Sequence, residues 1–129
     1  TSMEIHTNLR QLKNIMIPKF SLGKTETKMK LFVKGFHGHH SLGDVDNSPT
    51  IGHLNVDVKT IDNVSAELEI ETIDLLKIDV EGFEADVLQG ASSMLKEKRI
   101  GLIIFEVKES LLKSIEKTSA GVFKPLLDA

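Results

Sequence analysis

Residues 73–107, IDLLKIDVEGFEADVLQGASSMLKEKRIGLIIFEV, decide the fold of this 129-residue chain. The first eight of them are mostly apolar at consecutive positions, as in a strand that is covered on both faces. A turn at Glu81-Gly82 follows, and apolar side chains then recur at helical spacing as far as Leu95. Residues 100–107 form a second apolar run. This order of strand, helix and strand predicts a βαβ unit with parallel strands.

Three residues inside this unit need a local explanation. Gly82 falls at the turn, where we expect a backbone conformation that only glycine adopts easily. Gly90 falls inside the predicted helix, where glycine costs about 1 kcal/mol relative to alanine, so a close approach of the helix to its neighbours would explain it. Lys77 lies within the apolar strand and either pairs with a carboxylate at the strand end or extends its ammonium group to solvent.

The rest of the chain predicts short elements around a long loop. Apolar residues share one helical face within residues 4–14, and residues 15–17 predict a short strand. Residues 28–33 alternate as the second arm of a β-hairpin whose first arm is residues 19–22. Residues 35–52 are rich in Gly, His, Asp and Asn and predict a loop. Three further elements are a half-buried strand at 54–58, a turn or short helix at 60–68 and a helix at 109–117.

The composition excludes several classes of function. The chain is 40% hydrophobic and 27% charged, as expected for one soluble domain, and its longest apolar run is far shorter than the roughly 20 residues of a membrane span. A formal net charge of −3, no basic block and no Tyr or Trp argue against a nucleic-acid partner. With no cysteine and no leader pattern, we expect a cytoplasmic protein. Thr1 and Ser2 precede Met3 and resemble residues left by cloning.

Carboxylates gather where the two strands of the βαβ unit end. Asp79 and Glu81 follow the first strand, Glu84 opens the helix, and Glu106 ends the second strand. Ligands of parallel sheets bind beyond the carboxyl ends of the strands, so we expect these side chains at one functional edge. Like charges this close raise one another's pKa or bind a cation. The alternative is that Glu81 and Glu84 only stabilise the start of the helix.

Histidines gather in the long loop. His37, His39 and His40 lie within four residues, and His53 follows. Imidazole clusters bind metals, but this loop is flanked by glycines and lacks a regular ligand spacing. A loop that contacts substrate and a plain solvated loop are the other two interpretations, and we assign no metal site.

Residues 73–106 resemble the core of the FkbM-type methyltransferase family. The resemblance lies in three motifs that the family writes as Lys-Ile-Asp-Val-Glu-Gly-x-Glu, Leu-x-Gly-Ala and Phe-Glu. They occur here as Lys77-Ile78-Asp79-Val80-Glu81-Gly82-Phe83-Glu84, Leu88-Gln89-Gly90-Ala91 and Phe105-Glu106. Weaker matches are His40-Ser41-Leu42 to a Ser-Ser-Leu loop, Val58-Lys59-Thr60-Ile61-Asp62 to a Val-x-Thr-Leu-Asp step, and residues 8–33 to a helix and hairpin.

This resemblance implies a Rossmann-like, S-adenosylmethionine-dependent methyltransferase that acts on a hydroxyl group of a sugar or natural product. It implies that Asp79 lies beside the methyl donor, and that Asp79 or Glu81 accepts or orients the hydroxyl proton as the catalytic carboxylate. We also expect four residues, from the acidic strand ends and the histidine loop, to contact the small-molecule acceptor. They are Glu84, Glu106, His40 and Ser41.

One family motif has no counterpart here. The glycine-rich Gly-Ala-Asn-x-Gly cofactor loop is missing from residues 1–129, and no Gly-x-Gly occurs among the nine glycines. We therefore expect the C-terminal part of such a domain: an α/β fold with a partial Rossmann-like parallel sheet, flanking helices and a β-hairpin, and no assigned cofactor-binding residues. An exposed strand edge would favour a homo-oligomer. The alternative is a non-catalytic remnant or self-associating module that binds metal weakly through the His37–His40 loop.

Overall fold

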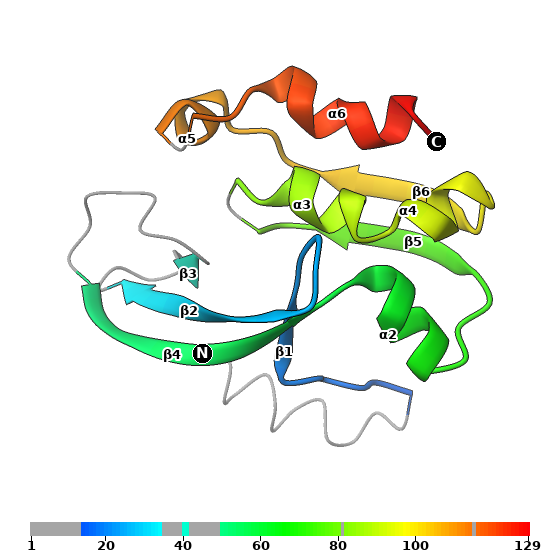
Figure 1. Cartoon of the computed structure of the whole chain (residues 1–129), viewed down its shortest axis with the longest axis horizontal. Helices are drawn as coiled ribbons and strands as arrows, with labels where there is room; N and C mark the ends of the chain where they lie inside the picture. Colours follow the sequence, from blue (N-terminus) through cyan, green and yellow to red (C-terminus); the bar gives the residue numbers. More distant parts are fainter. Residues whose placement is uncertain (1–13, 35–39, 42–49, 81, 115) are drawn as a thin grey trace.

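A computed structural model of the chain describes residues 14–34, 40–41, 50–80, 82–114 and 116–129. The strands are β1 (Phe20–Leu22), β2 (Thr27–Lys34), β3 (His40–Ser41), β4 (Thr50–Lys59), β5 (Ile73–Ile78) and β6 (Ile100–Phe105). The helices are α2 (Ile61–Glu67), α3 (Glu84–Gln89), α4 (Ser92–Lys96), α5 (Glu109–Ser114) and α6 (Ser119–Leu127). Figure 1 shows how they are arranged. The expected α/β class is confirmed.

The predicted βαβ unit is confirmed. Strands β5 and β6 pair in parallel from Ile73–Ile100 to Ile78–Phe105, and α3 and α4 connect them. These two strands are the whole of their sheet among the described residues, so a larger Rossmann-like sheet stays a prediction.

One face of the β5–β6 sheet is exposed. Leu76 and Ile103 pack on the core from the other face, beneath the helices. By contrast, the side chains of Leu75, Leu102 and Ile104 are each about half exposed. The expectation of a strand covered on two sides was wrong for the described part of the chain, because the helices pack on one face only. The core residues are Ile61, Ile78, Ala85, Val87, Leu88, Ala91, Met94, Leu112 and Val122.

The single predicted helix between the strands is two helices. The helical path breaks at Gly90, where an added Cβ would lie 2.1 Å from the carbonyl oxygen of Gly23. Figure 1 shows the turn between β1 and β2 reaching α3 at this place. The close approach expected at Gly90 is therefore confirmed, and the neighbour is a turn from the other half of the chain.

The predicted hairpin between residues 19–22 and 28–33 was wrong. Both arms are strands, but β4 lies between them, and the sheet runs in the order β1-β4-β2-β3. Strand β4 pairs in parallel with β1 and antiparallel with β2. A strand has two edges of hydrogen-bonding groups, and the ten residues of β4 are long enough to serve both neighbours.

Other predictions from the first half need correction. Residues 15–17 form no strand and are exposed, because the apolar run meets no partner strand before Pro18. The predicted loop at 35–52 contributes residues 40–41 to β3 and residues 50–52 to β4. The remainder of that loop, and residues 4–13 of the predicted N-terminal helix, lie outside the described residues.

Three helices complete the comparison with the sequence. The uncertain segment at 60–68 is α2, which begins because Thr60 Oγ1 accepts a hydrogen bond from the backbone of Asn63 at 3.1 Å. The predicted C-terminal helix is α5, and Leu112 is its buried anchor. Helix α6 was not predicted, since Gly121 and Pro125 obscure its apolar pattern.

Candidate functional site

The carboxyl ends of β5 and β6 lie at one edge, which we call the rim. Ile78 pairs with Phe105 at the last step of the register, so Asp79 and Glu106 follow at neighbouring positions. Because parallel strands end on the same side, both carboxylates are presented at the edge where α/β sheets bind their ligands. The structure thus brings together two of the four acidic residues expected there.

Each rim carboxylate has a lysine two residues away. Lys77 Nζ lies 3.3 Å from Asp79 Oδ2, and Lys108 Nζ lies 3.5 Å from Glu106 Oε2. The side chains of Asp79 and Glu106 are 53% and 63% exposed, so solvent and small molecules reach both. The structure shows both alternatives for Lys77, because its side chain pairs with Asp79 and is 69% exposed to solvent.

Glu84 has a structural contact. Its side chain is buried, and Oε1 accepts a hydrogen bond from the backbone N–H of Gly82 at 3.1 Å. Gly82 has φ 97°, the left-handed conformation expected from its place in the turn. The alternative that Glu84 stabilises the start of the helix therefore matches its contacts. Its assignment to substrate binding stays a prediction.

The other predicted site residues are placed only in part. Glu81, His37 and His39 lie outside the described residues. His40 and Ser41 form β3, opposite Val33 and Phe32 of β2, and this fixes their backbone only. Within the described ranges, no three His, Cys, Asp or Glu side chains gather closely enough to hold a metal ion. The roles of these residues remain predictions.

A pocket of about 290 Å³ lies beside the Gly82 turn, and the sequence did not reveal it. It lies between the turn after β1, the start of α3 and the segment before α6. Lys117 Nζ pairs with Asp86, lies 3.4 Å from the carbonyl oxygen of Gly82, and stands 4.3 Å from the ring centroid of Phe83. Lys24 also lines this pocket. Lys24 and Lys117 are far apart in the sequence, so no local pattern predicts that they line the same pocket.

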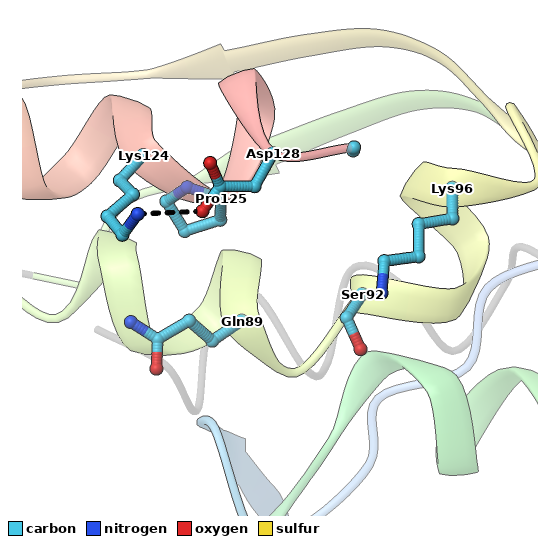
Figure 2. A pocket seen from close by; sticks show the side chains of 7 residues that line it. Gln89, Ser92, Lys96, Lys124, Pro125 and Asp128 are labelled. Carbon is cyan, nitrogen blue, oxygen red and sulfur yellow. Dashed lines mark ion pairs between the residues drawn. The ribbon is translucent and has the colours of Figure 1, made fainter.

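A second pocket of about 250 Å³ lies between α6 and the junction of α3 with α4 (Figure 2). Lys124 Nζ pairs there with Asp128 Oδ2 at 2.9 Å, so the positive charge of Lys124 in this pocket is already compensated. The pocket includes Gln89 at the end of α3, whereas the rim adjoins the beginning of that helix. Neither Asp79 nor Glu106 lines it.

A comparison with protein families matches this chain to the one described as Methyltransferase FkbM domain, over residues 8–120. The chain belongs to the FkbM methyltransferase family. The matched part of this FkbM domain includes the rim, the Gly82 turn and the pocket beside them. Methyl transfer in general is the activity that this membership indicates.

Further comparisons add no relatives. Neither the curated proteins nor the solved structures contain a match to the FkbM domain described here. Among its described helices, none is long and apolar enough to cross a membrane.

Proposed function

We propose that this FkbM domain takes part in S-adenosylmethionine-dependent transfer of a methyl group to a hydroxyl of a small molecule, such as a sugar or natural product. In this proposal the domain supplies the acceptor side, and Asp79 and Glu81 are the catalytic carboxylates. Family membership supports the reaction class. The observation that carries the assignment is the register of β5 and β6, which ends both strands at one acidic edge.

The residues at the rim suit part of the methyl donor. S-adenosylmethionine, when bound, supplies an electrophilic methyl group on a positively charged sulfur. The exposed carboxylates of Asp79 and Glu106 are chemically suited to a cation and to the hydroxyl groups of a ribose. The nine glycines contain no Gly-x-Gly, so we assign no residues to the remainder of the donor.

The domain's own residues would act mainly by alignment. Holding an acceptor oxygen in line with its reaction partner is worth roughly 7–11 kcal/mol in well-oriented systems. The hydrogen bond from the backbone N–H of Gly82 to Glu84 Oε1 stabilises the turn at the start of α3. The carboxylate of Asp79 would accept the hydroxyl proton as a general base.

Substitution of Asp79 tests this role. Asp79→Asn keeps the size of the side chain and removes its charge and its capacity to accept a proton. We expect turnover by the active enzyme that carries this domain to fall roughly 10²–10⁴-fold, the range for a lost general base. The melting temperature should barely change, because the exposed pair with Lys77 is worth only about 0–1 kcal/mol.

The matched control is Lys77→Met, which breaks the same ion pair and leaves the carboxylate in place. We expect this variant to keep most of its turnover. Equal losses in the two variants would show that only the ion pair matters. Full turnover in Asp79→Asn would remove Asp79 from the mechanism.

A further inference from the structure

The pocket beside the Gly82 turn is apolar over part of its lining. Its apolar lining comes from one residue in each of four elements: Leu22 of β1, Met29 of β2, Val58 of β4 and Phe83 at the start of α3. Its volume of about 290 Å³ is just below the roughly 300–1,000 Å³ typical of small-molecule pockets. Phe83, which lines this pocket, follows Asp79 by four residues in the chain.

The charged residues of the pocket leave one positive charge uncompensated. Its lining holds two lysines, Lys24 and Lys117, and one carboxylate, Asp86. The side chain of Asp86 is only 17% exposed and pairs with both: Lys24 Nζ lies 3.7 Å from Oδ1, and Lys117 pairs with Oδ2. One carboxylate thus holds two ammonium groups that come from the turn after β1 and from the segment before α6.

The two lysines differ in how fully they are engaged. Lys117 has Asp86, the carbonyl of Gly82 and the ring of Phe83 as partners. Lys24 is 59% exposed, and its distance to Asp86 is near the outer limit for an ion pair. Since an ammonium group has three donors, Lys24 can bind a further acceptor without giving up Asp86.

We propose that this pocket binds an anionic group of the methyl acceptor, so that the substrate is a small hydroxyl compound with a carboxylate or phosphate on an apolar body. That the bound molecule is the methyl acceptor rests on the proposed function. That the pocket binds an anion rests on the pocket alone. Lys24 is the primary contact for the anion, Lys117 completes its charge environment, and the apolar body packs on Phe83, Met29 and Val58.

The first experiment measures binding of a matched pair of probes. The probes are 3-(4-hydroxyphenyl)propionate and its neutral amide, which share the ring and hydroxyl and differ in the charge. We expect NMR titration of the 129-residue chain to give about tenfold tighter binding of the acid, the difference made by one charge-assisted hydrogen bond. Lys24→Gln should bring the two probes to similar affinity.

The matched control is Lys28→Gln. Lys28 is on β2, outside this pocket, and its side chain is 83% exposed beside Asp57. Equal affinity for acid and amide in the wild type would overturn the proposal. So would the absence of binding by either probe, or an equal loss of acid binding in the Lys24→Gln and Lys28→Gln variants.

A second measurement separates this proposal from the proposed function. In the active enzyme, Lys24→Gln should raise KM for an anionic acceptor about tenfold relative to KM for its neutral analogue. Full turnover of Asp79→Asn with Lys24-dependent binding intact would overturn the catalytic assignment and leave the pocket standing. Turnover that depends on Asp79, with acid and amide bound alike, would overturn the pocket and leave the catalytic assignment standing.

Discussion

At Gly90, a single hydrogen atom in place of a methyl group allows the two halves of the chain to touch. The position has an ordinary helical φ of −70°, so its backbone conformation does not require glycine. It is the carbonyl oxygen of Gly23, 2.1 Å from where a Cβ would stand, that excludes every other residue. A backbone atom cannot move aside by a rotamer change, so the steric conflict would persist.

We predict that Gly90→Ala destabilises the chain by about 1–3 kcal/mol, although alanine favours helix by about 1 kcal/mol elsewhere. The free energy of unfolding in urea measures this effect. Gly121→Ala in α6 is the control, because its Cβ would meet only Thr118 Oγ1 at an ordinary 3.5 Å. This variant should be slightly stabilised. A Gly90→Ala variant as stable as the wild type would contradict the contact between Gly90 and Gly23.

At the scale of elements, α4 depends on a residue of α2 for its first turn. The N-cap residue of α4 is Ala91, which has no side-chain acceptor. Asp62 takes this role from a distance: its carboxylate accepts hydrogen bonds from the backbone of Ser93 at 2.9 Å and of Met94 at 3.1 Å. Asp62 is the last residue of the Val-x-Thr-Leu-Asp step of the family resemblance. Its hydrogen bonds to the start of α4 explain what an aspartate does at this position.

We predict that Asp62→Ala lowers the free energy of unfolding by about 1–2 kcal/mol, since it leaves two backbone N–H groups without their acceptor. Asp62→Asn keeps one acceptor oxygen and should lose less. Thermal or urea unfolding measures both. Asp57→Ala is the reference for loss of an exposed pair, with an expected change of about 0.5 kcal/mol. An Asp62→Ala effect no larger than this reference would exclude the capping role.

At the scale of the whole molecule, one face of the β5–β6 sheet exposes apolar side chains to solvent. Leu75 and Leu102 are register partners on that face, and Ile104 follows. Contiguous apolar side chains on a sheet favour association with another surface. This observation adds a reason to expect a homo-oligomer beyond the strand edge considered from the sequence.

We predict that the chain self-associates at tens of micromolar, roughly the range of a modest interface, and that Leu102→Lys returns it to a monomer. Sedimentation velocity measures the mass in solution. Leu127→Lys is the control, because Leu127 is 82% exposed on α6 rather than on this face. A monomeric wild type, or a Leu127→Lys variant that dissociates as Leu102→Lys does, would count against association through the sheet.

The rim shows how far the candidate site could be predicted. Asp79 and Glu106 were expected at one edge because each directly follows an apolar strand, and the register confirms this placement. The contact of Glu84 with Gly82 was open, since side-chain direction in a turn depends on a φ value that spacing does not specify. The pocket with Lys24 and Lys117 carried no sequence signal at all.

The sequence by itself determined the elements whose cause is local. The βαβ unit, the turn at Gly82 and the acidic edge follow from periodicity and from residues adjacent in the chain. Tertiary structure decided the rest: it put β4 between β1 and β2, and it divided the helix where Gly90 meets Gly23. It also joined Lys24 and Lys117 through Asp86. Each of these depends on contacts between distant segments, which a local pattern of apolar and polar residues does not encode.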